Sequence, residues 1–509
     1  MLGPGKGFAG RCLGVIWGLL LLLTPRPLQA APPRYQVPAV VHVHSTWSSG
    51  EQTLDELIAR ARARGIEAIF LTENYLHRFE YGLPPLRNLL RYRVDYPSLL
   101  RHGPGEFLTA VREATARQRD VLLVPGAEVI PHYHWTGSLL KGTLTMHNAQ
   151  KNLLVFGLTH AEDYRDLPAV GNPDAAGWGS ATLWLLSPVL LAVPGIWLLR
   201  LRRQRRIRLR HFRVNVERRF TGYGILCLAV GAVLLANNFP FRVPAFSLYD
   251  ADAGLRPHQA VIDFVASRGG LTAWSLPEAS DHHVVAVWGL RATIRTEPYA
   301  GDLLQTDRFA AFGGVHEDRN TFPEPGAGWD RLLADYLQGR RSRPAWAIGE
   351  AAYHREGEAG KRFGDIQTVF LVQQKDASSL LAALRAGRLY ARQQRPEGGL
   401  ILEDFRVLVP GRPPGEAGDM ILARAGDRPE VVALLRAADG RRMEIEVRLV
   451  RGGTVIHAGR GETPITVRWT DAALPNPGKV FYRLEARAPG GHRVLSNPIF
   501  VRATEGGSR

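Results

Sequence analysis

Residues 39–74 read AVVHVHSTWSSGEQTLDELIARARARGIEAIFLTEN, and this stretch decides the fold class. Residues 40–44 and 68–71 are short apolar segments of the kind that form strands. Residues 54–64 between them carry apolar side chains at helical spacing, namely Leu54, Leu57, Ile58 and Ala61. The stretch therefore predicts a strand, a helix and a second strand, the opening unit of an α/β fold.

The same alternation continues along the chain. Three further helix and strand pairs are predicted at 107–118 with 121–124, 258–267 with 271–274, and 329–337 with 345–348. Alternating helices and short apolar strands favour a parallel α/β sheet or a barrel.

The pattern changes at about residue 403. Strands then recur about every ten residues, and segments such as 443–449 and 481–486 alternate apolar and polar side chains. We expect an all-β sandwich of immunoglobulin-like type over residues 403–503.

The N-terminus has the anatomy of a signal peptide. Lys6 and Arg11 precede an apolar run at 12–23, and small residues follow near position 30. We predict a signal peptide at 1–30. A retained anchor is the alternative, but the run is shorter than the ~20 residues needed to cross a bilayer.

Two later segments, 175–199 and 220–241, are uncharged and long enough to span a membrane. The alternative, two buried core helices, would need partners on every face. The segment between them, 200–219, holds ten Arg and one Glu. Because short arginine-rich loops stay in the cytoplasm, we expect a transmembrane hairpin at 175–241 with a cytoplasmic loop at 200–219. Both soluble parts then lie on the outer, periplasmic or extracellular side.

Composition excludes two other classes of protein. The formal net charge is +16, but residues 200–219 alone supply +9, so no basic stripe for nucleic acid is left elsewhere. The spans hold no ionisable residue that would line a transport path. Only two cysteines occur, so a disulfide framework is not available.

His42 and His44 are the first residues that point to chemistry. Two apart on a strand, their side chains leave the same face and can converge on one cation. An isolated His-x-His pair is more often two ordinary polar side chains at the end of a strand. The surrounding motifs therefore decide whether this pair binds a metal.

Those motifs resemble the PHP (polymerase and histidinol phosphatase) family. The resemblance rests on His42-Val43-His44-Ser45 with the helix and strand after it, on Gly126-Ala127-Glu128, on 270–278, on Gly349 to His354, and on 380–390. It covers residues 36–174 and 242–400, the two parts of the domain that the hairpin interrupts, and it implies a distorted β/α barrel.

The sequence also departs from the family. Ser49, Asn74, Leu276 and Ala352 stand where the family usually has metal ligands. The metal site is therefore partly degenerate, and three ions are out of reach.

The resemblance implies a smaller ligand set: His42, His44, Glu73, Glu128 and His354. Imidazoles and a carboxylate suit one divalent transition metal, Zn, Mn or Fe. We assign catalysis to His42, His44 and Glu128. Weaker candidates are His77, His147 or Asn152, Asp281, His282, His283 and His316, with Arg78 and Arg392 for a phosphate group.

Two functions follow from this reading. The first is a membrane-anchored, outward-facing metal-dependent phosphoesterase that hydrolyses phosphate esters. The alternative is a catalytically degenerate PHP barrel that acts as a binding or scaffolding module at the cell envelope.

Overall fold

The predicted strand, helix and strand at the start of the fold are present in the computed structural model. They are β1 (Tyr35–Val43), α2 (Leu54–Ala63) and β2 (Ala68–Leu71), and β1 pairs with β2 in parallel. Helix α2 begins at a capping box in which Thr53 and Glu56 exchange hydrogen bonds, which satisfies two backbone donors at the helix start.

The structure describes residues 34–209, 212–395, 398–424, 426–472, 474 and 478–504. The predicted signal peptide at 1–30 lies outside these residues. Tyr35–Arg509 forms one compact unit.

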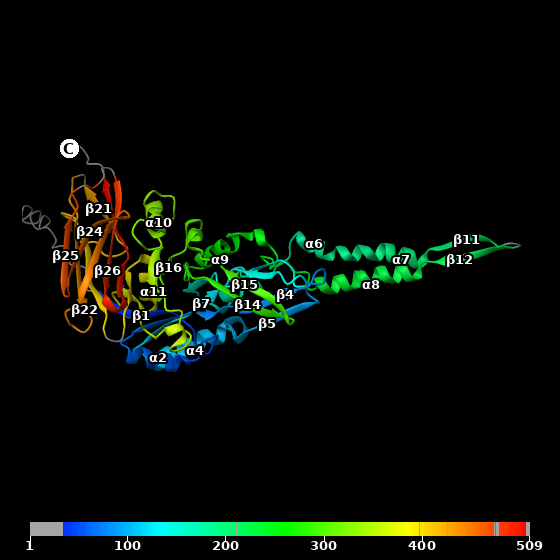
Figure 1. Cartoon of the computed structure of the whole chain (residues 1–509), viewed down its shortest axis with the longest axis horizontal. Coiled ribbons are helices and arrows are strands. Elements are labelled where there is room, and N and C mark those ends of the chain that lie inside the picture. Colours follow the sequence, from blue (N-terminus) through cyan, green and yellow to red (C-terminus); the bar gives the residue numbers. More distant parts are fainter. Residues whose placement is uncertain are drawn as a thin grey trace, which may run out of the picture. The chain divides into compact units, whose positions relative to one another are not determined.

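The largest sheet has eleven strands and contains β1 (Figure 1). Its main path is β21-β28-β26-β27-β19-β18-β1-β2-β6, and β23 and β24 join it through β26. The bounds not yet given are β6 (Leu122–Val124), β18 (Ile366–Val372), β19 (Leu389–Gln393), β21 (Met420–Arg424), β23 (Glu444–Arg451), β24 (Thr454–Glu462), β26 (Gly478–Ala488), β27 (His492–Ser496) and β28 (Ile499–Thr504).

A second, six-stranded sheet has the order β17-β16-β13-β10-β7-β3. Its strands are β3 (Glu73–Asn74), β7 (Gly126–Val129), β10 (Leu153–Phe156), β13 (Leu271–Trp274), β16 (Ala311–Val315) and β17 (Trp346–Gly349). Both sheets contribute to one apolar core, which also buries α4 (Pro104–Arg117), α9 (Arg256–Ser267), α10 (Gly328–Leu337) and α11 (Ala377–Ala386).

The mixed α/β architecture is confirmed, whereas the predicted barrel is not detected among the described strands. The strands divide between two hydrogen-bonded sheets, and antiparallel pairs interrupt the parallel ones. Strand β18 is antiparallel to β1, and β10 is antiparallel to both β7 and β13.

A smaller layer is built from residues on both sides of the helix pair. Four strands, β14-β15-β9-β8, form one sheet, and β4 pairs with β5. Their bounds are β4 (Arg78–Gly82), β5 (Arg91–Asp95), β8 (His134–Thr136), β9 (Leu144–His147), β14 (Asp281–Val287) and β15 (Leu290–Thr296). These strands share an apolar cluster of their own, which includes Tyr81, Trp135 and Ile294.

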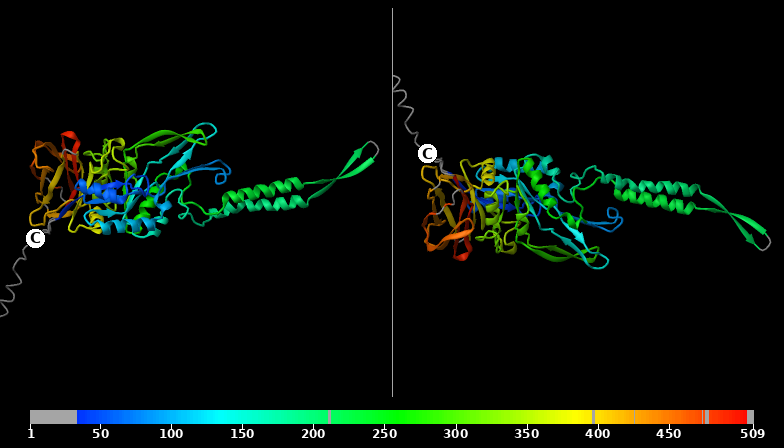
Figure 2. Two further views of the ribbon diagram at one scale, coloured as in Figure 1. Left: turned by 90° about the horizontal axis from the view of Figure 1, so that it is seen from below. Right: turned by 90° about the horizontal axis from the view of Figure 1, so that it is seen from above.

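Two helices in the middle of the chain are long and apolar enough to cross a membrane. They are Ala181–Arg200, made of α6 (Ala181–Leu186), a 3-10 turn and α7 (Ala192–Arg200), and α8 (Thr221–Asn238). Helices α7 and α8 lie side by side in all three views (Figures 1 and 2).

The predicted arginine-rich loop is instead largely a two-stranded ladder. Strands β11 (Arg202–Leu209) and β12 (Phe212–Arg219) pair antiparallel, with Arg202 opposite Arg219. The connection at 200–219 thus contains two strands that no apolar pattern marked, and its cytoplasmic side stays a prediction.

The C-terminal strands enclose a separate apolar cluster. A three-stranded sheet, β20 (Leu400–Leu408), β22 (Glu430–Ala437) and β25 (Ile465–Thr470), shares it with β21, β23, β26 and β28 of the large sheet. The immunoglobulin-like topology of this region stays a prediction.

Candidate metal centre

His42 and His44 converge at the end of β1, as the sequence predicts. Their Nε2 atoms are 3.1 Å apart. Regular strand alternation is not the reason, because His42 has a φ of 71° and the pairing of β1 with β2 shifts register between Val41 and Val43. Such a left-handed backbone at a non-glycine residue costs about 1–3 kcal/mol and is typical of functional sites.

Glu128 on β7 completes the group. Its Oε1 lies 3.3 Å from His42 Nε2, and its Oε2 lies 3.5 Å from His44 Nε2. Asn152 donates a hydrogen bond of 2.7 Å to Glu128 Oε1 and fixes the carboxylate. Donor atoms of His42, His44 and Glu128 all lie within 4.8 Å of one another, close enough to hold one ion.

Glu350, at the end of β17, orients His42. It accepts a hydrogen bond of 2.6 Å from His42 Nδ1, and further ones from Ser275 Oγ and the Leu276 backbone N–H. The carboxylate fits because residue 313 is glycine: a Cβ at Gly313 would lie 2.0 Å from Glu350 Oε2. Since Nδ1 donates to Glu350, Nε2 is the ring nitrogen of His42 that faces the group and is the one placed to bind a metal.

The electrostatics of the group are those of a cation site. Burial alone would lower the pKa of His42, but Glu128 and Glu350 outweigh it and raise the pKa to about 9. Burial and the neighbouring His354 hold the pKa of His44 well below its ordinary value. Burial disfavours ionised Glu128, yet the nearby His42 keeps the pKa of Glu128 far below its ordinary value. One positive charge among two imidazoles and a carboxylate therefore satisfies the group.

This donor set fits a divalent transition metal. Two imidazole nitrogens and one carboxylate are the three-ligand pattern of catalytic sites that leave a position for water or substrate. The hydrogen bonds of His42 to Glu350 and of Glu128 to Asn152 hold the donors in place.

Glu73, predicted as a ligand, lies outside the group. Its buried carboxylate accepts hydrogen bonds from the backbone and hydroxyl of Ser45 and from the Ser48 hydroxyl. Ser48 Oγ in turn lies 3.3 Å from His44 Nδ1. Glu73 therefore fixes the segment after β1 and, through Ser48, the ring of His44.

His354 and His77 lie close to the group without joining it. The ring of His354 stacks on that of His44, with centroids 4.1 Å apart. Burial lowers the pKa of His77, and the charge of Glu128 opposes that shift. Among the described residues the buried Nδ1 of His77 has no hydrogen-bond partner.

The weaker histidine candidates separate into two sets. His147 Nε2 lies 2.8 Å from the Thr136 hydroxyl in the small sheet, and His283 Nδ1 lies 2.7 Å from Asp281. The exposed His282 shares that strand. His316 is buried, and its Nε2 has no hydrogen-bond partner in the described part of the chain.

The two candidate phosphate ligands are engaged in the protein itself. Arg78 is paired with Asp95, and the buried Arg392 donates two hydrogen bonds to Gln367. Neither arginine contacts the histidine group in these pairings.

Leu276 and Ala352 stand where the sequence resemblance expects metal ligands, and both have an unusual backbone. Their φ values of 37° and 43° lie in the left-handed region that L residues rarely adopt. Their side chains offer no ligand atom.

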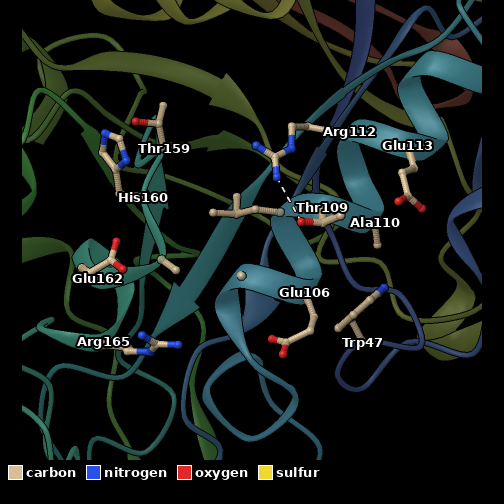
Figure 3. A pocket seen from close by; sticks show the side chains of 13 residues that line it. Trp47, Glu106, Thr109, Ala110, Arg112, Glu113, Thr159, His160, Glu162 and Arg165 are labelled. Atoms are coloured by element: carbon tan, nitrogen blue, oxygen red, sulfur yellow. Dashed lines mark hydrogen bonds between the residues drawn. The ribbon is translucent and has the colours of Figure 1, made fainter.

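A polar hollow of about 690 Å³ lies between α4 and residues 159–165 (Figure 3). Glu106, Arg112, Glu162 and Arg165 line it, a mixture typical of solvated helix surfaces. None of His42, His44 and Glu128 lines it. We therefore place the chemistry at the histidine group and not in this hollow.

Sequence reasoning missed Glu350 as part of the site. The residue stood in the quoted segment Gly349 to His354, but its partner His42 is 308 positions away in the chain. Asn152 was one of two alternatives, and the structure places it, and not His147, against Glu128. A polar residue just before the buried strand β10 was its only local signal.

No protein-family model and no curated protein matches the sequence. Solved structures that resemble the chain include the following three. A two-domain protein of Bacteroides vulgatus, described as containing a predicted PHP-like metal-dependent phosphoesterase, is 13% identical, with a TM-score of 0.34 and coverage of 90% of this chain and 94% of that one.

The other two each cover 64% of this chain and 90% of their own, at 12% identity. They are a candidate metal-dependent phosphoesterase of Bifidobacterium adolescentis, with a TM-score of 0.27, and an amidohydrolase of Chromobacterium violaceum with bound sulfate and no metal, with a TM-score of 0.26. Likeness at this level assigns neither a family nor an activity to this chain.

Proposed function

We propose that this chain is a membrane-anchored, metal-dependent phosphoesterase of PHP type that binds one divalent transition ion through His42, His44 and Glu128. The observation that carries the proposal is the convergence of two imidazole Nε2 atoms and one carboxylate in a buried place. The sequence motifs around these residues, which resemble the PHP family, select phosphate esters as the substrate class.

Each residue has a role that follows from its contacts. His42 and His44 offer Nε2 and Glu128 offers a carboxylate oxygen as ligands. Glu350 holds the His42 ring, and Asn152 holds Glu128. When bound, such an ion supplies Lewis-acid activation of water and neutralises charge on a phosphate group.

The membrane anchor is supported by the exposure of the two apolar helices. Only 11% and 17% of the residues in their most apolar windows are buried, which argues against core helices. The ladder β11–β12 between the helices carries exposed arginines, so the positive-inside rule places it in the cytoplasm. We infer a domain at 36–174 and 242–400 that the hairpin interrupts, followed by a β-sandwich at 403–503, both on the outer side.

The test is elemental analysis of the full chain in detergent, together with a screen of phosphate esters. We expect about one transition ion per chain in the natural protein and in the control His160→Ala, which changes an exposed histidine outside the group. His42→Ala and Glu128→Ala should lose both the ion and hydrolysis.

Two results would contradict the proposal. Absence of bound metal under all metals offered would overturn the site itself. A bound ion without hydrolysis of any ester would favour the binding or scaffolding module, to which the non-ligand residues Asn74, Leu276 and Ala352 already point.

A further inference from the structure

The small layer of strands next to the metal centre encloses an apolar cavity of about 420 Å³, within the size range of ligand pockets. Its walls come from the hairpins β4–β5, β8–β9 and β14–β15. Lining side chains include Phe79, Tyr92, Trp135, Met146, Val285 and Ile294.

One end of this cavity lies on the side of the metal group, because Gln150 there stands two residues before Asn152, which hydrogen-bonds Glu128. His77 lines the cavity as well, and the charge of Glu128 acts on its ring. Gln150 also lines it, and its backbone oxygen accepts a hydrogen bond from Tyr299, which donates to the backbone oxygen of Ser275 as well. Ser275 in turn donates to Glu350.

Polarity falls along the cavity away from that end. Strand β14 starts at Asp281 and His283 and continues to Val285 and Val287, while β4 runs from beside His77 to Tyr81. Asp281 and His283 therefore stand at the first end of these strands, and the groups toward the tips of the hairpins are apolar or aromatic apart from Glu80, which pairs with Arg91.

The tips themselves expose large apolar side chains. Five such residues on the three hairpins are between 42% and 81% exposed: Leu89, Leu90, Leu140, Trp288 and Leu290. Single exposed apolar residues are ordinary, but a group on three neighbouring tips marks an interaction surface. Tyr92 and Trp288 bring two of the tips together, with ring centroids 5.9 Å apart.

One tip is fastened to a candidate membrane helix. Asn88 donates from its backbone and from its side chain to Asn237 near the end of α8, at 2.9 and 2.7 Å, and the backbone of Leu89 donates to Asn237 as well. The apolar surface of the tips is thus continuous with a helix long and apolar enough to span a bilayer.

From this arrangement we propose that the substrate is a lipid phosphoester, whose phosphate reaches the metal centre while one apolar chain occupies the cavity and leaves it between the hairpin tips. The inference rests on the proposed phosphoesterase function. Hydrolysis breaks the P–O ester bond: the water oxygen joins phosphorus, and a proton goes to the leaving oxygen.

The test compares ethyl and dodecyl phosphate as substrates of the full chain in detergent micelles. Each buried methylene favours binding about fourfold, so burial of roughly three to four of the additional methylenes in the cavity is enough to raise kcat/KM on the order of 100-fold for dodecyl phosphate. Val285→Glu places a charge in the cavity and should collapse this ratio, and Val94→Glu should do so from the opposite wall.

Val284→Glu is the matched control. Consecutive residues of a strand point to opposite faces, and Val284 is half-exposed outside the cavity. It should keep the ratio of the natural protein. Because micelles take up the dodecyl probe equally for all variants, comparison with Val284→Glu removes that contribution.

Ethyl and dodecyl phosphonate, which are not hydrolysed, separate the two proposals through equilibrium binding. Hydrolysis with equal kcat/KM for both phosphates would overturn the lipid inference and leave the phosphoesterase standing. No hydrolysis, with tighter binding of dodecyl phosphonate that Val285→Glu abolishes, would overturn the phosphoesterase and support a lipid site. No hydrolysis and no chain-length effect on binding would overturn both.

Discussion

Two buried clusters of charged and polar residues illustrate different uses of charge inside this protein. At the candidate metal centre, two imidazole nitrogens and a carboxylate lie close enough together to hold one ion. Around Arg483, a fully buried guanidinium donates two hydrogen bonds to Asp330 on α10 and one to Glu485 on β26. The second cluster has a permanent cation of its own, whereas we propose that the first binds an ion from outside.

The histidine group is a candidate binding site, whereas the Arg483 cluster has a structural role. Arg483 also stacks over Trp329, with its guanidinium carbon 4.8 Å from the ring centre, and it joins the helix α10 to the strand β26. The pair itself adds little to the stability of the fold. Removal of one partner is nevertheless strongly destabilising, because it leaves a buried charge without a countercharge.

Arg483→Met should give the largest loss of stability. It leaves Asp330 and Glu485 buried without their partner, and we expect the free energy of unfolding to fall by about 3–5 kcal/mol. Urea unfolding of the detergent-solubilised chain would measure this. The control is Arg406→Met, which removes an exposed pair with Asp404 and should cost at most about 1 kcal/mol. Equal losses in the two variants would contradict the comparison.

Added zinc should stabilise the folded protein by binding at the candidate metal centre. At a free concentration 100 times the dissociation constant, one bound ion adds about 2.7 kcal/mol to the free energy of unfolding, and a chelator removes this contribution. His42→Ala should show no response to zinc, whereas Arg406→Met should respond as the natural protein does. A response retained in His42→Ala would mean that the ion binds elsewhere.

Glu350→Gln should weaken the ion without removing a ligand. The carboxylate orients His42, and loss of such a partner usually costs 10- to 100-fold in metal affinity, or about 1.4–2.7 kcal/mol. Gly313→Ala should act in the same direction, since its Cβ would displace Glu350. Competition with a zinc chelator measures the zinc affinity of both variants. An unchanged affinity in Glu350→Gln would mean that Glu350 has no role in metal binding.

His258 offers a third case, a buried titratable group with no countercharge. Its ring stacks on Trp274, and burial lowers the pKa of His258 to about 3. Between pH 3 and 6.5 the unfolded chain binds a proton that the folded chain does not, so stability falls as the pH falls, by about 1.4 kcal/mol per pH unit.

His258→Phe keeps the stacking and removes the titration. From pH 7.5 to 5.5 its unfolding free energy should gain about 1.4 kcal/mol relative to that of the natural protein. Parallel stability curves over this range would show that His258 is protonated in the fold.

The sequence predicted features that depend on residues close together in the chain, and it missed contacts between residues far apart in the chain. Spacing within residues 39–74 was enough to predict β1, α2 and β2. His42 and His44 do converge, but through the left-handed backbone of His42 and not through the strand alternation on which the prediction was based. The role of Glu350 depends on a contact across 308 positions, and that of Glu73 on hydrogen bonds from Ser45 and Ser48. No periodicity reports such contacts.

The layer around the apolar cavity escaped prediction for a related reason. Strands β8 and β9 precede the helix pair, and β14 and β15 follow it. Strands β8 and β9 have only three and four residues, and the pairing of β9 with β15 brings residues 144–147 beside 292–295. These segments are strands because they pair with segments far away in the chain, and their own apolar patterns do not indicate this.

The pairing of β19 with β27 has a practical consequence for anyone who wishes to shorten the protein. Tyr390 lies opposite Ser496 and Gln393 opposite Arg493, so one ladder continues from the strands of the metal centre into the C-terminal region. A chain cut near residue 400 would end with β19 as a bare edge, with unpaired N–H and C=O groups open to another molecule. Truncated protein should therefore self-associate through strand addition, and preparations that omit the two apolar helices should keep residues up to 504.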